Sequence, residues 1–310
     1  MIDLIPHFER ACAAAALACQ PWVGRGDKEA ADAAAVEAMR RVFAQAPMAG
    51  RIVIGEGERD EAPMLFIGEE VGNGDPGSAA VDIAVDPLEG TTLCAENRPG
   101  ALCVAAVAPR GGLLHAPDVY MQKIAVGPGL RLDGTDLDRP VEAVLRGLAR
   151  QVGGPLRVVM LDRPRHEGAK RAALAVGADL TLIPEGDVMG ALQTALPDTP
   201  TGEPPFHVYL GSGGAPEGVL AASGLQALGG SMIGRLLFRD GAERSRAAAI
   251  GLADLDQIYT IDDLAAPSSH LVLAGVTTDV LAGVQGRQID ILTLSPGQET
   301  SRQGTPRRHK

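Results

Sequence analysis

The sequence predicts an α/β fold in which an α+β N-terminal part is followed by an α/β part rich in parallel strands. The first half of the chain shows two helix patterns and then several short apolar strand patterns. The second half alternates between strand and helix patterns three times. Because strands joined by helices pair in parallel with right-handed crossovers, this alternation predicts a parallel sheet.

In the first half, helices are predicted over Ile2–Cys19 and Glu29–Ala44, and Asp27 is the expected N-cap of the second helix. A further helix is expected over Ala62–Val71, opened by Pro63. The expected strands of this half are Arg51–Ile54, Ala79–Val85, Leu102–Ala108 and Met121–Val126.

In the second half, the predicted strands of the alternating run are Leu156–Leu161, Leu180–Ile183 and His207–Leu210. The predicted helices of that run are His166–Val176, Val188–Leu196 and Pro216–Leu228. Two later strands are expected, over Leu271–Ala274 and Gln288–Leu294. The predicted organisation is an α+β part at residues 1–135, an α/β part at 136–296 and a flexible tail at 297–310.

Composition excludes several classes of protein. The 310 residues are 45% hydrophobic, which predicts a packed core and not whole-chain disorder. Lys and Arg number 28 against 39 Asp and Glu, a formal net charge of −11, so a nucleic-acid binder with a basic surface is not expected. No apolar run approaches the roughly 20 residues that span a membrane.

Cysteine usage favours the cytoplasm. The four cysteines, at positions 12, 19, 94 and 103, show no C-x-x-C spacing, and a chain of this length folds without a disulfide framework. The apolar stretch Ala11–Cys19 resembles a short signal-peptide core, but Asp3 and Glu9 offset Arg10. An Ala-rich helix is therefore the favoured interpretation.

The stretch DIAVDPLEGTT, residues 82–92, gathers oxygen ligands at the end of a strand. Asp86 ends the strand, Glu89 follows, Gly90 allows a tight turn, and Thr91 supplies a hydroxyl at the start of a helix. Such oxygen groups are what hard cations such as Mg²⁺ prefer. The alternative is a polar strand-to-helix turn with a capping threonine.

A second acidic turn, IVIGEGERDE, places Glu56 and Glu58 just past another strand. Like charges at two strand ends repel one another unless a cation or a basic group lies between them. An acidic surface loop is the alternative, and Asp32 on the preceding helix is by spacing alone an ordinary solvated carboxylate.

Three turns of the second half also contain polar groups that suit a ligand. The stretch GSGGAPEG, residues 211–218, reads as a Gly-rich turn with Pro216 at N1 of a helix, which suits a phosphate, although Glu217 could instead complement the helix dipole. Arg163 and Arg165 suit a phosphate, or form a solvated basic turn. The segment Glu185–Asp187 could accept sugar hydroxyls, or Asp187 could be a helix cap.

Together these stretches resemble the motifs of class II, or GlpX-type, fructose-1,6-bisphosphatases, which belong to the inositol-monophosphatase-like superfamily of metal-dependent phosphatases. The matching stretches occur in the family's order and cover roughly residues 11–237. They are Trp22–Asp32, Ile52–Leu65, Val81–Thr92, Ala116–Gly129, Arg163–His166, Pro184–Asp187 and Gly213–Gly218.

The resemblance implies a role for individual residues. One divalent cation, Mg²⁺ or Mn²⁺, is implied at Asp32 and Glu56, and a second at Asp86, Glu89 and Glu217, with Thr91 orienting the attacking water. The implied catalytic residues are Thr91, Asp86, Glu56 and Asp32. The implied substrate-binding residues are Glu89, Gly90, Thr91, Tyr120, Arg163, Pro164, Arg165, Glu185, Gly186, Asp187 and Gly214. The chain departs from the family pattern at Arg163, where lysine is usual, and at Glu185, where aspartate is usual.

The resemblance also implies a layered αβαβα sandwich with a metal-binding N-terminal part, a substrate-binding α/β part and the site in the cleft between them. The implied reaction is hydrolysis of the 1-phosphate of fructose 1,6-bisphosphate, as in gluconeogenesis, by a cytoplasmic homo-oligomer (dimer or tetramer). Three alternatives are a dual or sedoheptulose-1,7-bisphosphatase, an inositol-phosphate phosphatase, and an inactive sugar-phosphate-binding protein. No nucleic-acid or membrane partner is expected.

Overall fold

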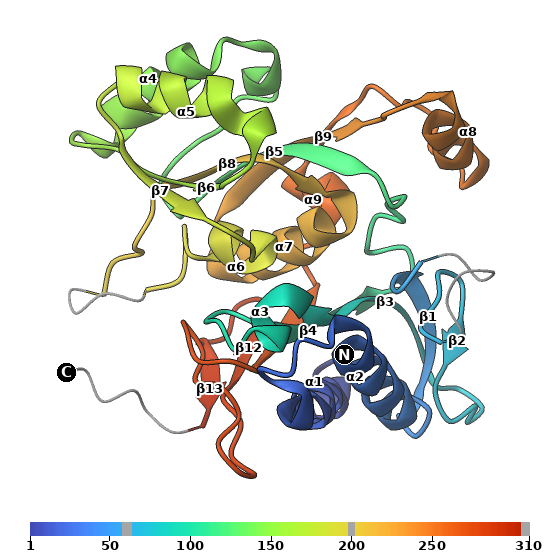
Figure 1. The fold of residues 1–310 in the computed structure, drawn as a ribbon. Helices are drawn as coiled ribbons and strands as arrows, with labels where there is room; N and C mark the ends of the chain where they lie inside the picture. Colours follow the sequence, from blue (N-terminus) through green and yellow to red (C-terminus); the bar gives the residue numbers. More distant parts are fainter. Residues whose placement is uncertain (58–63, 198–201, 305–310) are drawn as a thin grey trace. The chain divides into compact units, whose positions relative to one another are not determined.

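The computed structural model describes residues 1–57, 64–197 and 202–304. The chain divides into two compact units, which are described separately (Figure 1). Unit 1 comprises residues 1–113 and 268–310, and unit 2 comprises residues 114–267. Each unit has its own mixed sheet, which confirms the predicted α/β class.

The sheet of unit 1 has the strand order β13-β12-β11-β4-β3-β1-β2. Strands β1 and β3 are parallel, and every other neighbouring pair is antiparallel. The strands are β1 (Met48–Ile54), β2 (Glu70–Val71), β3 (Ala79–Glu89), β4 (Leu102–Pro109), β11 (His270–Gly275), β12 (Ile291–Leu294) and β13 (Ser301–Gln303). The parallel pair matters for function, because both of its carboxyl ends lie at one edge of the sheet.

Two long helices pack on one another and on this sheet (Figure 1). Helix α1 (Ile5–Cys19) follows the 3₁₀ turn η1 (Ile2–Leu4), and a second 3₁₀ turn, η2 (Gln20–Trp22), leads toward α2 (Lys28–Phe43). The predicted N-cap is confirmed, since the Asp27 carboxylate accepts a hydrogen bond of 3.0 Å from the Ala30 N–H. With few aromatic side chains available, small alanine and cysteine side chains let the helices approach closely.

The sheet of unit 2 has the strand order β10-β9-β5-β8-β6-β7. The predicted alternating run forms the parallel strands β6 (Arg157–Leu161), β7 (Asp179–Ile183) and β8 (Val208–Gly214). Strand β5 (Tyr120–Val126) runs antiparallel to both β8 and β9 (Ser231–Leu237). The remaining strand is β10 (Ile258–Thr260).

Helices cover both faces of the second sheet (Figure 1). Helices α4 (Val141–Val152) and α5 (Glu167–Ala175) lie on one face, and α6 (Asp187–Leu192) and α7 (Ala215–Leu228) on the other. The other helical elements are α3 (Thr91–Ala95) of unit 1 and η3 (Asp136–Asp138), η4 (Pro164–His166), α8 (Gly241–Ala249) and α9 (Ile261–Leu264) of unit 2.

The helix predicted over Ala62–Val71 is wrong for residues 64–71, and residues 62 and 63 lie outside the described residues. This segment folds back on β1: the Leu65 carbonyl accepts from the Glu56 N–H, and the Ile52 N–H donates to the Glu69 carbonyl. Leu65 has a left-handed φ of 53°, which a helix excludes. Backbone pairing with β1 thus replaces helix formation, and the segment ends in the short strand β2.

The compact units also differ from the predicted boundaries. Residues 268–296 were assigned to the second part, but β11 pairs antiparallel with β4 and so completes the first sheet. Part of the predicted flexible tail is ordered, since β13 pairs with β12 and Arg302 forms an ion pair with the buried Asp290. Residues 305–310 lie outside the described residues. Pairing between strands distant in sequence leaves no local signal, and this accounts for the difference.

All four cysteines are buried and free, as expected for a chain that needs no disulfide. Within the described ranges, none of the helices combines the length and the apolar character that crossing a bilayer requires.

Asp82 is a buried charge inside β3, and its removal tests how strongly the first sheet depends on it. Its carboxylate accepts from Arg51 at 3.0 Å and from the Gly111 N–H at 2.6 Å. We expect Asp82→Ala to lower the free energy of unfolding by about 1–3 kcal/mol, because the Gly111 N–H loses its acceptor. Denaturant titration measures this. The control Glu96→Ala breaks an exposed pair with Arg98 and is expected to cost less than about 1 kcal/mol; equal losses would contradict the prediction.

Candidate active site

Three carboxyl groups of unit 1 lie at one edge of its sheet. Glu56 follows the end of β1, and Asp86 lies near the end of β3. The two strands run parallel and their last pair is Ile54 with Ala84, so Glu56 and Asp86 each follow that pair by two positions. Asp32 reaches the same place from helix α2, and its carboxyl group shares a hydrogen bond with that of Glu56.

Electrostatics bind these three groups into one cluster. Burial raises the pKa of Glu56 to about 8, and the negative charges of Asp32 and Asp86 contribute to the same shift. Burial also raises the pKa of Asp32, against the lowering effect of its hydrogen bond with Glu56. Without a cation the cluster therefore retains a proton at neutral pH.

The predicted turn at Gly90 and the helix start at Thr91 are confirmed, but β3 does not end at Asp86, since it continues to Glu89. A bulge interrupts the pairing of β3 with β4 between Asp86 and Glu89, and Glu89 is only 6% exposed. Gly90 has a left-handed φ of 80° and is the N-cap of α3, which begins at Thr91. Among the described residues, the Thr91 hydroxyl has no hydrogen-bond partner. The alternative of Thr91 as a structural cap is therefore not supported.

The glycine before Glu56 lies close to the returning chain. A Cβ on Gly55 would lie 1.9 Å from the Leu65 carbonyl oxygen. Gly55 is required for the chain to fold back on β1. Glu58, from the same turn, lies outside the described residues.

The donor chemistry of the cluster fits a hard divalent cation. Its groups are carboxyl oxygens whose burial raises the pKa values of Asp32 and Glu56, and the negative charges of Asp32 and Asp86 add to the shift of Glu56; a cation would offset both effects. In the conformation described, no three Asp, Glu, His or Cys side chains of the described residues converge closely enough to form a complete ligand set. The fit therefore rests on the donor chemistry and the electrostatics of this cluster.

Unit 2 contains a pocket of about 280 Å³ at one end of its sheet. The central strand β5 places Tyr120 directly between Gly214 of β8 and Leu237 of β9. The residues that line the pocket are Asp118, Val119, Tyr120, Gly214, Glu217 and Arg239. Three predicted site residues, Tyr120, Gly214 and Glu217, are thus brought together.

The Gly-rich segment is part of a strand and not a turn, which corrects the prediction. Strand β8 continues to Gly214 and α7 begins at Ala215, so Pro216 is the second helical residue. A Cβ on Gly213 would lie 1.8 Å from the Asp187 carboxylate, and one on Gly214 would lie 1.9 Å from that of Glu217. The glycines therefore make room for two carboxylates.

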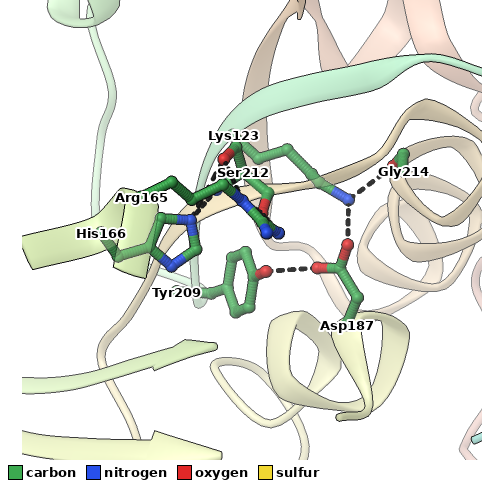
Figure 2. A network of polar contacts seen from close by, with 7 residues as sticks. All are labelled: Lys123, Arg165, His166, Asp187, Tyr209, Ser212 and Gly214. Carbon is green, nitrogen blue, oxygen red and sulfur yellow. Dashed lines mark hydrogen bonds and ion pairs between the residues drawn. The ribbon is translucent and has the colours of Figure 1, made fainter. Parts of the chain in front are cut away.

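Arg165 is held by Ser212 of β8 (Figure 2). Its guanidinium donates to the Ser212 carbonyl at 2.6 Å and lies 4.8 Å from the centre of the Tyr120 ring. His166 is buried, and its Nε2 accepts from the Ser212 N–H at 2.9 Å, so Nδ1 donates to the Leu161 carbonyl. Burial lowers the pKa of His166, which favours this neutral form. His166 thus anchors β8, and Arg165 extends from it.

A buried ion pair joins the other side of this network (Figure 2). Lys123, 1% exposed, donates to the Asp187 carboxylate at 2.5 Å and to the Gly214 carbonyl at 2.8 Å. The Tyr209 hydroxyl donates to the other oxygen of Asp187. Asp187 therefore supports Gly214, a lining residue of the pocket, through Lys123. The N-cap of α6 is Gly186 and not Asp187, the residue that was considered as a helix cap.

Glu217 lies where several charges meet. Burial raises its pKa; Lys123 opposes that shift, and the negative charge of Asp187 adds to it. Its carboxylate packs over Gly214, whose carbonyl Lys123 holds.

The remaining predicted substrate residues are not among the described residues that line this pocket. Arg163 donates to the carbonyl of its neighbour Asp162 at 3.0 Å, and Pro164 begins the turn η4. Glu185 is half-buried beside Gly186. Their predicted roles stay predictions.

Two positively charged side chains of the second unit were not predicted from the sequence. Lys123 lies inside the strand that was predicted, and a lysine within such an apolar stretch is a signal for a buried ion pair. Arg239 follows β9, a strand that was not predicted. The apolar run MIGRLLF before it was the available signal.

The fold and the cluster first define a class: an α/β protein with a carboxylate cluster suited to a hard cation at the end of a parallel strand pair. The sequence profile of the family described as "Bacterial fructose-1,6-bisphosphatase, glpX-encoded" matches residues 3–307. The chain belongs to this family.

Curated relatives agree with this family. Fructose-1,6-bisphosphatase 1 class 2 of Escherichia coli (strain K12) is 42% identical in an alignment that covers 91% of this chain and 87% of the relative. The D-fructose 1,6-bisphosphatase class 2/sedoheptulose 1,7-bisphosphatase of Prochlorococcus marinus (strain MIT 9313) is 42% identical in an alignment that covers 84% of this chain and 80% of the relative.

The proton held by the acidic cluster predicts a pH dependence of stability. The pKa of Glu56 in the folded state, about 8, lies above its ordinary value, so the folded protein binds the proton more tightly than the unfolded chain does. The stabilisation is complete below the ordinary pKa and is lost as pH rises toward 8. Between pH 5 and pH 8, the free energy of unfolding of the metal-free wild type is therefore expected to fall by at least about 1 kcal/mol more than that of the metal-free Glu56→Gln variant.

Denaturant titrations in chelator at both pH values measure this difference. The control is Glu37→Gln, an exposed carboxyl of α2, which is expected to behave as the wild type. A wild type and a Glu56→Gln variant with the same pH dependence would contradict the shared proton.

Proposed function

We propose that this protein hydrolyses the 1-phosphate of fructose 1,6-bisphosphate to give fructose 6-phosphate and inorganic phosphate. The observation that supports this most directly is the carboxylate cluster of Asp32, Glu56 and Asp86, in a chain that matches the bisphosphatase family over residues 3–307. A phosphate monoester is highly anionic and hydrolyses very slowly without a catalyst, so a cluster able to hold divalent cations suits this chemistry.

The proposed metal ligands are the carboxylates that the family resemblance implies. Asp32 and Glu56 would hold one Mg²⁺ or Mn²⁺, and Asp86, Glu89 and Glu217 a second. When bound, such cations supply Lewis-acid polarisation of the phosphate and of the attacking water. The raised pKa of Glu56 means that the cluster releases its proton when a cation binds, so cation affinity is expected to rise with pH up to about 8.

The chain's own residues would position the reactants. The Thr91 hydroxyl, which has no partner among the described residues, orients the water for in-line attack on phosphorus. The water oxygen forms the new bond to phosphorus as the bond from phosphorus to the sugar O1 breaks; the water gives up one proton, and O1 gains one, so that the products are the sugar hydroxyl and inorganic phosphate. Tyr120, Arg163 and Arg165 bind the other phosphate, with binding energy that orients the reacting end.

A second substrate, sedoheptulose 1,7-bisphosphate, is supported by the name of the relatives from Prochlorococcus marinus. It is a sugar bisphosphate of the same type, so the same cluster would serve it. Phosphate release from both bisphosphates and from an inositol monophosphate, measured with one preparation, separates these activities. The cytoplasmic location and the homo-oligomeric state stay predictions of the family resemblance.

Chelation tests the proposed metal dependence. We expect chelator to abolish phosphate release and added Mg²⁺ or Mn²⁺ to restore it. Asp86→Asn is expected to lower kcat/KM by at least about 100-fold, since even residues behind a metal ligand contribute 10–100-fold. The cation is also expected to raise the Tm of the wild type and to raise that of the variant less.

The control for this variant is Asp75→Asn, an exposed carboxyl of unit 1 that is expected to leave both readouts unchanged. Full activity of the wild type in excess chelator would reject the metal mechanism.

Thr91 is tested by comparing two adjacent threonines of α3. Thr91→Ala is expected to lower kcat about 10–100-fold with little change in KM, because orientation of the water matters mainly in the transition state. Thr91→Ser should be milder, and the neighbouring Thr92→Ala should leave kcat within about twofold. Steady-state kinetics with fructose 1,6-bisphosphate measure this; a wild-type kcat in Thr91→Ala would make Thr91 a structural residue only.

A further inference from the structure

The pocket of unit 2 has an unusual charge balance for a site that binds a phosphate. Asp118 and Glu217 contribute carboxylates to it, and Arg239 is the only cation among the described residues that line it. A phosphate group entering the pocket would meet two acidic side chains. Apart from a divalent cation held by Glu217, Arg239 is the positive group that the described lining residues offer to a phosphate.

Arg239 is held in position by a buried carboxylate. Glu243, on helix α8, is 2% exposed; it accepts from the Arg239 backbone N–H at 2.7 Å and from Nε at 2.5 Å. Nη2 of Arg239 also pairs with Glu243. A carboxylate that binds both the backbone and the side chain of one arginine fixes the direction of the guanidinium. The side chain itself is 69% exposed, so its other edge is open.

Tyr120 connects this arginine to Arg165. Tyr120 lines the pocket together with Arg239, and Arg165 lies over the Tyr120 ring at 4.8 Å. The Nε and Nη2 groups of Arg165 are already bonded to Ser212. Arg165 therefore has only part of its guanidinium left for a ligand, and a doubly charged phosphate would gain from a second arginine.

We propose that Arg239 is a second phosphate-binding arginine of this pocket, positioned by Glu243, and that it binds the phosphate of the sugar bisphosphate that is not hydrolysed. This inference rests on the proposed function, since it assigns a residue to the substrate of that reaction. It makes Arg239 a determinant of the preference for a bisphosphate over a monophosphate.

The experiment compares two substrates that differ only in the 6-phosphate. For Arg239→Met, kcat/KM on fructose 1,6-bisphosphate is expected to fall about 10–100-fold, the range of a lost charge-assisted hydrogen bond. On fructose 1-phosphate the same variant should stay within about twofold of the wild type. Glu243→Gln, which keeps the shape but removes the charge, should show a smaller loss on the bisphosphate alone.

A matched control lies on helix α8, next to Glu243. Arg244 of α8 forms an exposed pair with Asp256, with two bonds of 2.9 Å, and is not a lining residue of the pocket. Arg244→Met should leave both substrates unchanged. Because Arg239→Met leaves Glu243 buried without its cation, the double variant Arg239→Met/Glu243→Gln is measured as well. It should fold and should show the same selective loss.

Calorimetric titration with fructose 6-phosphate tests the site without hydrolysis. The wild type should bind it, and Arg239→Met should bind at least about tenfold more weakly. No binding by the wild type, unchanged binding by the variant, or an equal loss on both substrates would overturn the assignment. A wild type that binds fructose 6-phosphate but does not hydrolyse the bisphosphate would contradict the proposed function and leave the role of Arg239 supported.

Discussion

Repulsion between carboxyl groups at the ends of two parallel strands is the constraint on which the candidate metal site depends. Strands β1 and β3 deliver Glu56 and Asp86 to one edge of the first sheet, and α2 adds Asp32. Burial and mutual repulsion raise the pKa of Glu56 to about 8, so the cluster without a cation retains a proton. Packing elsewhere in the unit keeps these carboxyl groups close together. Strand β1 is held by the returning segment at Leu65, which requires Gly55. Helix α2 is held by its N-cap Asp27 and by its contact with α1. The first unit thus uses ordinary packing to keep unfavourable charges together, and a cation would resolve the conflict.

The first unit buries negative charges, whereas the second unit buries a positive one. Lys123 lies within the central strand β5 and is balanced by Asp187 and by the Gly214 carbonyl. A buried ammonium without such partners would cost several kcal/mol, so the strand, the start of α6 and the end of β8 are fixed relative to one another. That arrangement leaves Tyr120, Gly214 and Glu217 around one pocket. Figure 2 shows Asp187 in contact with Lys123 and Tyr209, and Lys123 also holds the carbonyl of Gly214, a lining residue of the pocket.

Local signals predicted the elements well where the sequence pattern and the fold agreed. Asp27 caps α2, and the run from β6 to α7 has the expected order and parallel pairing. These local signals failed where contacts with a segment distant in sequence fix the backbone conformation. Residues 64–71 have a helix-like composition but pair with β1, and the glycines of residues 211–214 suggest a turn but extend strand β8. In that strand Gly213 and Gly214 lack a side chain where the carboxylates of Asp187 and Glu217 pack, and no local sequence pattern reveals this contact.

Hydrophobic periodicity and turn residues act over a few positions, and they were enough to predict the fold class, most of the helices and strands, and the acidic residues that follow the strands. The resemblance of the sequence motifs added the family, which the comparisons confirmed. Three features became clear from the folded chain alone: β11 completes the first sheet, Asp187 faces Lys123, and Arg239 lies at the pocket of Tyr120. Each of these depends on pairing between residues far apart in the chain. The free energy of such a contact comes from burial and charge at the place where the segments meet, and a single stretch of sequence contains only one of the two partners.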